Sequence, residues 1–336
     1  MDENGDHKYT RGEAYSETDS LGGYEFQPNN YDAAASAHLV VLTRNESRTG
    51  TAKECVDAFT GQPPGVRILE APSGSKVLSP MTTLISEVIR LYSGDVDMTV
   101  AEATTMINSA FGLGNADHTQ IDPIYAASNG EIGVYGPVIG TINMIANLVS
   151  SVGTLLFGMS SMYGGRLNEN DCEMKVYSGI AREVNEALLV ASRAGNRKLL
   201  TTHLLDLSNS DAISGIAKSS LYSASLTNIQ LRSTTYSPDA LNATVSLSVN
   251  SGTAIKNSLS DLTNPTNLIK EVTAASKVAQ DPVVLKSILN SATGSATDAD
   301  IATLDGVRDP ASYAAKATNE TDTIAVTIPL YPPPPS

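Results

Sequence analysis

The chain contains little of what several common functional classes need. Its 336 residues include no Trp, four Phe and two Cys. A core with so few large aromatic side chains packs helices closely, but it offers few anchors for a tight ligand pocket. Cys55 and Cys172 lie far apart in the sequence, and a single pair is too few for a disulfide framework. We expect two free thiols, with a bridge between two subdomains as the alternative.

Basic residues are also scarce. The chain has 22 Lys and Arg against 36 Asp and Glu, which gives a formal net charge of −14 at pH 7. Such a chain repels nucleic acid and anionic membranes, and it suits surroundings rich in divalent cations. The acidic N-terminus lacks the apolar stretch of a signal peptide. We therefore expect the sequence to be a piece of a longer protein.

Recognised catalytic motifs are missing as well. The four histidines (His7, His38, His118 and His203) show no metal-binding spacing such as H-E-x-x-H. No G-x-S-x-G motif or phosphate-binding loop occurs. The stretch GGYEF at residues 22–26 is similar to the GG(D/E)EF signature of diguanylate cyclases, but only 21 residues precede it, which leaves no room for the strands of a nucleotide-binding domain. We predict that the protein is not an enzyme.

The sequence does contain a calcium-loop pattern, DENGDHKYTRGE, at residues 2–13. An EF-hand-type loop places ligands at its first, third, fifth, seventh and twelfth positions, because a tight loop turns alternate side chains toward one hard cation. The predicted Ca²⁺ ligands are Asp2, Asn4, Asp6, Lys8 (through its backbone carbonyl) and Glu13. His7 stands where the sharp turn normally has Gly, so a residue with a Cβ has to adopt a near-left-handed conformation. The alternative interpretation is an acidic, solvated surface turn.

The rest of the chain divides into a β-rich and a helical part. Strands are predicted over residues 14–18, 24–26, 38–43 and 67–70, separated by Gly- and Pro-rich turns. From Ser79 onward, apolar residues recur at helical spacing. Helices are predicted over residues 80–92, 99–111, 123–127, 138–162, 171–194, 197–208, 211–223, 238–261, 266–279 and 282–290. Val245, Leu247 and Val249 also alternate as in a strand, but the wider spacing favours a helix there.

These elements predict an α+β fold that is mostly α. A small sandwich-like β subdomain with the calcium loop occupies residues 1–76, and a long helical bundle occupies residues 77–318. Residues 319–336 are predicted to hold a strand (residues 324–330, IAVTIPL) and a Pro-rich linker to a next module.

Residues 132–165 contain no charged side chain. This run is long enough to cross a membrane. Polar residues such as Asn143, Asn147 and Ser151 recur through it, and no basic anchor precedes it, so we predict a buried central helix rather than a span. Two acidic stretches, residues 168–171 and 298–300, could hold secondary cations, but helix caps are the favoured interpretation.

Three stretches together resemble one arrangement found in very large bacterial surface proteins. DENGDHKYTRGEAYSETDSLGGYEF resembles the calcium loop and hairpin that open many of their modules. APSGSKVLSPMTTLISEVI resembles the linker and first helix that follow, and MTVAEATTMINSAFGLGNADHTQIDPIYAAS resembles the next helix and the Asp-Pro helix start. Such modules accompany cadherin-like, VCBS-like and other adhesin repeats. The resemblance covers residues 1 to about 165.

The resemblance implies an extracellular, calcium-rigidified structural or adhesive module at the cell surface. Its partners would be neighbouring modules or identical subunits, together with a cell-surface or matrix ligand. A first alternative is a self-assembling subunit of an extracellular filament or surface layer. A second, weaker alternative is a membrane-inserted helical protein built on residues 132–165.

Overall fold

The computed structural model describes residues 16, 24, 39–42, 57, 64–93, 97–162, 167–193, 205–227 and 238–326. This part of the chain is mostly helical with one small two-stranded antiparallel sheet, which confirms the predicted fold class in outline. The calcium loop, the strands predicted at 14–18 and 24–26 and the Pro-rich linker lie largely or wholly outside the described residues. The sandwich-like arrangement and the division at residue 76 stay predictions.

The described elements, in chain order, are β1 (Leu39–Leu42), β2 (Ile68–Ala71), α2 (Pro80–Tyr92), α3 (Val100–Phe111), α4 (Pro123–Ala126), the π-helical segment η2 (Ala127–Glu131), α5 (Ile132–Met162), α6 (Glu169–Arg193), α7 (Ser210–Thr227), α8 (Pro238–Ser258), α9 (Pro265–Ala279), α10 (Pro282–Ala292), α11 (Asp298–Arg308) and α12 (Pro310–Thr321).

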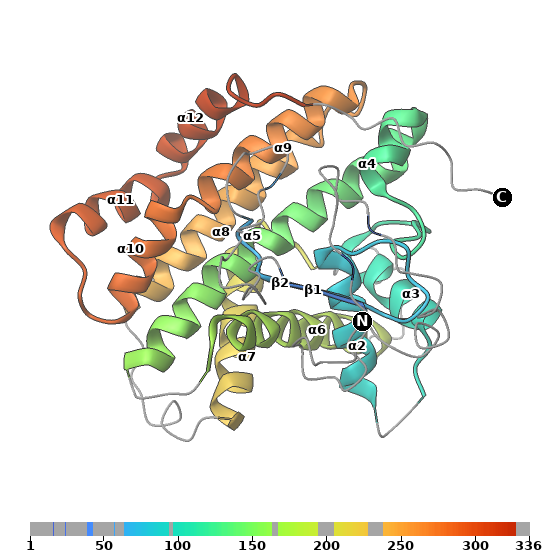
Figure 1. The fold of residues 1–336 in the computed structure, drawn as a ribbon, viewed down its shortest axis with the longest axis horizontal. Coiled ribbons are helices and arrows are strands. Elements are labelled where there is room, and N and C mark those ends of the chain that lie inside the picture. Colours follow the sequence, from blue (N-terminus) through green and yellow to red (C-terminus); the bar gives the residue numbers. More distant parts are fainter. Residues whose placement is uncertain are drawn as a thin grey trace.

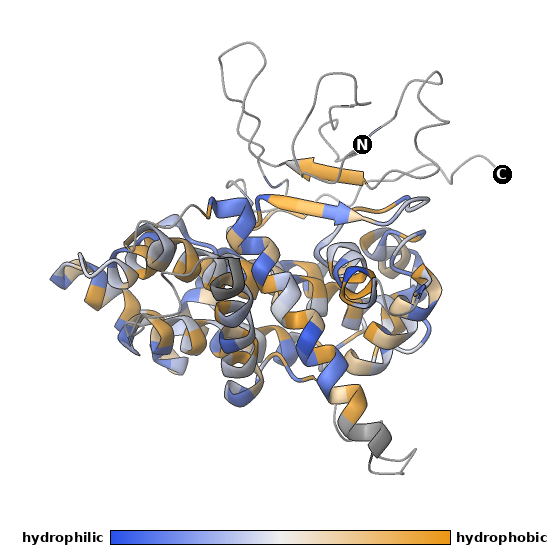
Figure 2. Cartoon of the chain, turned by 90° about the horizontal axis from the view of Figure 1, so that it is seen from below, coloured by the Kyte–Doolittle hydropathy of each residue, from blue (hydrophilic) through white to orange (hydrophobic). Residues whose placement is uncertain are grey.

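Both predicted strands in this part are present, within a residue or two of their expected ends. Leu39 pairs with Ala71 and Leu42 pairs with Ile68, so β1 and β2 run antiparallel. Figure 2 shows that the sheet lies on one face of the helical body, with β2 between β1 and the helices. The sheet is therefore attached to the helices through β2.

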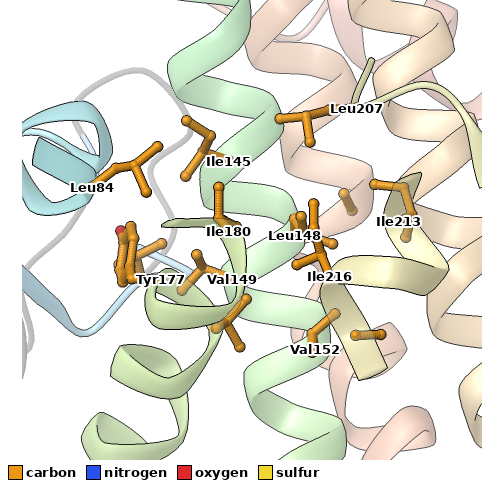
Figure 3. Close-up of a cluster of buried hydrophobic side chains, with 14 of the residues drawn as sticks. Leu84, Ile145, Leu148, Val149, Val152, Tyr177, Ile180, Leu207, Ile213 and Ile216 are labelled. Atoms are coloured by element: carbon orange, nitrogen blue, oxygen red, sulfur yellow. The ribbon is translucent and has the colours of Figure 1, made fainter. Parts of the chain in front are cut away.

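Helix α5 forms the centre of the bundle. In Figure 1 it crosses the middle of the molecule, with α8 and α9 on one side and α2 and α6 on the other. The stretch Pro123–Met162 is long and apolar enough to span a membrane, but 67% of its most apolar window is buried. Figure 3 shows why so much of this helix is buried: side chains of α2, α6 and α7 surround Leu148 and Val149 of α5. This is the environment of a core helix.

Most predicted helices begin and end within three residues of the observed bounds. Several begin with a capping residue followed by Pro, which is already suited to the first helical turn. Ser79, Asp122, Asn264, Asp281 and Asp309 each cap a helix that begins with Pro. The helical interpretation of residues 238–261 is confirmed as α8.

Three predictions were wrong in part. Helix α5 begins at Ile132, not at residue 138, and it contains Pro137 as an interior residue instead of beginning after it. The helix predicted over 197–208 is absent from its described end, where Leu205 donates its N–H to the carbonyl of Ala110 (2.8 Å) and residues 206–209 form a turn. Residues 324–326 are not in a strand; Ile324 is buried against the bundle instead.

Candidate functional site

The predicted calcium ligands, Asp2, Asn4, Asp6, Lys8 and Glu13, lie outside the described residues. Within the described ranges, no group of three or more His, Cys, Asp or Glu residues is arranged to hold a metal ion. The two acidic stretches considered as secondary cation sites are helix caps. Asp171 and Asn168 bond reciprocally at the start of α6, and Asp300 does so with Thr297 at the start of α11.

The most unusual group of side chains is at the attachment of β2 to α2 and α6, which we call the junction. It contains three glutamates, Glu70 (β2), Glu87 (α2) and Glu173 (α6), whose residues are 1%, 5% and 2% exposed. Carboxylates are almost never buried this completely unless they are paired or hydrogen-bonded. The junction is therefore where the charged chemistry of the described chain is concentrated.

The helix-facing edge of β2 bonds to side chains rather than to another strand. Backbone groups of successive strand residues point to opposite edges, so residues 69 and 71 face β1 while residues 68 and 70 face the helices. The hydroxyl of Thr83 accepts the N–H of Glu70 (2.9 Å), and the hydroxyl of Thr82 donates to the carbonyl of Glu70 (3.0 Å). Helix α2 therefore satisfies backbone groups that a third strand would otherwise pair.

Helix α6 contacts the same edge through Glu173. Its Oε2 accepts the backbone N–H groups of Arg67 (2.7 Å) and Ile68 (3.3 Å). The Arg67 guanidinium lies 3.7 Å from Oε1 of Glu173, while its Nε is nearer to Glu169 (3.1 Å). Burial raises the pKa of Glu173 to about 8, against the opposing effect of these N–H groups and of Arg67.

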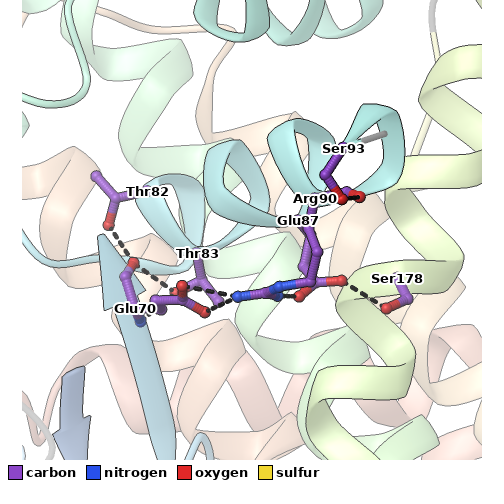
Figure 4. A network of polar contacts seen from close by, with 7 residues as sticks. All are labelled: Glu70, Thr82, Thr83, Glu87, Arg90, Ser93 and Ser178. Atoms are coloured by element: carbon purple, nitrogen blue, oxygen red, sulfur yellow. Dashed lines mark hydrogen bonds and ion pairs between the residues drawn. The ribbon is translucent and has the colours of Figure 1, made fainter. Parts of the chain in front are cut away.

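The charges of Glu70 and Glu87 meet at Arg90 of α2. One terminal nitrogen of Arg90 contacts both carboxylate oxygens of Glu70 (2.8 and 2.9 Å), and the other forms an ion pair with Glu87. Ser178 of α6 donates its hydroxyl to Glu87 (2.5 Å). Figure 4 shows this chain of contacts running from β2 through α2 to α6. The network links three elements that are distant in sequence.

A second polar cluster lies inside the bundle, around Asn147 of α5. Its side-chain amide donates to Ser251 of α8 (2.5 Å) and Ser276 of α9 (3.2 Å). The side-chain amide of Gln280 donates to the side-chain oxygen of Asn147 (2.8 Å), and the side-chain oxygen of Gln280 accepts the backbone N–H of Gly65 (3.1 Å). These side chains are amides and hydroxyls with no His, Asp or Glu among them to activate a hydroxyl, so the cluster serves to join helices.

His118 and Cys172, which lie within the described residues, are also held in structural positions. His118 is buried, with Nε2 2.5 Å from the side-chain oxygen of Asn108, and burial lowers its pKa to about 4. Cys172 is a free, buried thiol, as predicted for it, and burial raises its pKa to about 12. Cys55 lies outside the described residues. Neither His118 nor Cys172 is ready to act as a base or nucleophile at neutral pH.

One shallow depression of about 220 Å³ is found on the described surface, between α9, α10 and α12. Lys277 and Glu320, which line it, form a 2.6 Å ion pair with each other. Two of its charges therefore pair with each other across the helices, and Asp281 accepts the backbone N–H of Val283 at the start of α10. The depression does not present the group of convergent side chains that a catalytic pocket needs.

The sequence patterns did not predict the junction, although the position of Glu87 in the sequence could have indicated a buried charge there. Glu87 lies three residues after Leu84 and four before Leu91, on the face that the periodicity assigns to the core. A charge on a core face needs a partner, and Arg90 is one turn away. The contributions of Glu70 and Glu173 had no comparable signal because their partners come from other elements.

No protein-family model, curated protein or solved structure matches the chain.

Proposed function

We propose that the protein is a non-catalytic structural or adhesive module of an extracellular bacterial surface protein, stabilised by calcium at its N-terminal end. One observation carries this proposal: the buried charges at the junction connect secondary-structure elements to one another. Arg90 contacts Glu70 and Glu87, and Glu173 contacts the backbone of β2. The use of these buried charges to join elements supports a role that depends on the shape of the module.

The calcium part of the proposal depends on the spacing of the N-terminal acids. Asp2, Asp6 and Glu13 would repel one another until a cation neutralised them, so ion binding would contribute folding free energy. The ion would also fix the angle between the loop and a preceding module. The sandwich-like arrangement around the sheet belongs to this proposal.

Thermal melting in EDTA and in millimolar calcium tests the proposal. We expect calcium to raise the melting temperature of the full chain, because binding to the folded form alone stabilises it by mass action. The rise should be much smaller in Asp6→Ala, which removes one ligand. Asp97→Ala is the matched control, since Asp97 is exposed and lies outside the loop. Equal melting of the parent in both buffers would remove the role assigned to the ion.

A second candidate function is self-assembly, and the outer edge of β1 favours it. By the alternation described above, the backbone groups of Val40 and Leu42 point away from β2. Among the described elements β1 has no neighbour on this side, and its sequence (LVVL) contains neither Lys nor Pro, which usually protect natural edge strands. We propose β1 of a second copy as the partner, because two identical edges can pair antiparallel about a two-fold axis.

Sedimentation velocity and electron microscopy, with and without calcium, separate the two candidates. Val40→Pro removes an outward-pointing N–H, which an edge strand tolerates, and should abolish association. Val40→Ala retains that N–H and should continue to associate. Monodisperse single copies of the parent at all concentrations would contradict self-assembly and leave the passive module.

A further inference from the structure

We infer that β1 pairs with β1 of a second copy in one register, centred on Val41, and that this pairing stops at two copies. The pairing is the self-assembly proposed above, on which this inference rests. Its register and its limit come from the directions of backbone groups within the sheet.

The inner edge of the sheet sets the limit. Glu173 accepts the N–H of Ile68 (3.3 Å). Thr83 accepts the N–H of Glu70 (2.9 Å), and Thr82 donates to its carbonyl (3.0 Å). Figure 2 shows the helical body directly beside this edge, so an added strand would have to displace these bonds and the helices that make them. Of the two described strands, only β1 is therefore placed to extend the sheet.

The outer edge of β1 suits a second copy of the chain. The backbone groups of Leu39 and Val41 point toward β2. Those of Val40 and Leu42 point outward, and among the described elements no strand pairs with them. The strand (LVVL) has no charged side chain, so two copies can meet there without like charges opposite one another, although each chain has a formal net charge of −14.

The directions of these groups determine the register. In an antiparallel pair, outward-pointing residues must oppose outward-pointing residues, because each such pair exchanges both of its N–H···O bonds. Both outward residues of β1 are used at once only when Val40 opposes Leu42 of the second copy and Leu42 opposes Val40. The two Val41 residues then face each other on the two-fold axis as a non-hydrogen-bonded pair, with Cα atoms about 4.5 Å apart.

This register closes the assembly. The combined sheet has the order β2–β1–β1–β2, with a helical body against each outer β2. Pairing uses the one edge that the described sheet of each copy offers, so this edge produces a dimer and not a filament. The strand has only four residues, and such a small interface should give a reversible dimer that forms at high protein concentration.

Disulfide trapping of the full chain tests the register. Val41→Cys, in a Cys55→Ser background, should give a disulfide-linked dimer under mild oxidation, because Cα atoms about 4.5 Å apart suit a disulfide. Val40→Cys is the matched control, since its two copies lie diagonally across the axis at about 7–8 Å, which is too far to bridge. Cys172 stays in place because it is buried. Equal trapping of both variants, or trapping of neither, would overturn the register.

Sedimentation velocity of the parent over a wide range of protein concentration tests the limit. Calcium is held constant, and salt at about 0.15 M screens the net charge. We expect monomer and dimer alone, with the dimer lost in Val40→Pro and retained in Val40→Ala. Species larger than two copies that disappear in Val40→Pro would overturn the limit and leave self-assembly standing. Monomer at every concentration would overturn both the self-assembly proposal and the pairing inferred from it.

Discussion

Replacing Arg90 by Met tests whether the ion network at the junction stabilises the fold. The guanidinium contacts the carboxylates of Glu70 and Glu87, both nearly inaccessible to water. Met retains much of the aliphatic stem but removes the charge that both acids contact. Breaking a buried pair by removing one partner costs about 3–5 kcal/mol, because the other charge remains desolvated.

Partial exposure of Arg90 reduces that figure. Its side chain is 42% exposed, so water can approach the site once the guanidinium is gone. We expect the free energy of unfolding of Arg90→Met to fall by about 2–3 kcal/mol, near or below the lower end of the range for buried pairs. Urea unfolding at pH 7 and constant calcium concentration measures this loss.

Two comparisons make the Arg90 experiment specific to buried charge. Lys256→Met breaks the ion pair with Asp206, in which the side chains are 58% and 41% exposed, and should cost less than about 1 kcal/mol. Adding Glu70→Gln and Glu87→Gln to Arg90→Met should recover part of the loss, since neutral amides need no counter-ion. The reasoning fails if Arg90→Met costs no more than Lys256→Met, or if the neutral triple variant recovers nothing.

Two further predictions concern helix packing and pH. Gly252→Ala should destabilise the protein by about 1–3 kcal/mol in a thermal melt, because the new methyl collides with the backbone carbonyl of Leu207. Gly133→Ala meets nothing within 4 Å and should stabilise the helix by up to about 1 kcal/mol, so equal effects would contradict the packing argument. Burial lowers the pKa of His118 from 6.5 to about 4, so its contribution is present above pH 6.5 and lost as the pH falls toward 4. The stability difference between the parent and His118→Gln should change in that direction between pH 6.5 and 4, and a constant difference would refute it.

Local signals account for the parts of the fold that the sequence predicts well. Ser79-Pro80 and Asn264-Pro265 mark helix starts because the capping side chain and the fixed proline backbone act within one turn. The same signals stand before α11 and α12, at Thr297 with Asp300 and at Asp309-Pro310. Those helices were not predicted individually because their Ala- and Asp-rich sequences lack a strong apolar face, which is the pattern that periodicity detects.

Long-range partners account for what the sequence could not predict. The register of β2 on α2 and α6 depends on Thr83 and Glu173, which follow the strand by 13 and about 105 residues. No period in the sequence relates such positions. Glu87 can be assigned to a core face, but whether it meets a guanidinium, a hydroxyl or a metal is decided only when three elements come together.

The scarcity of large aromatic residues and the polar core of this chain are connected. A core made of Ala, Val, Leu and Ile lets helices approach closely, and such side chains fit together in several registers at similar cost. Asn147 removes that ambiguity, because only one register places its amide against Ser251, Ser276 and Gln280 together. Any slip of α5 along its neighbours would leave a buried amide without a partner, at about 1–3 kcal/mol for each lost group. The uncharged but polar run of residues 132–165 is thus suited to a central helix that must fit in one position, and a lipid-facing surface would have no use for that polarity.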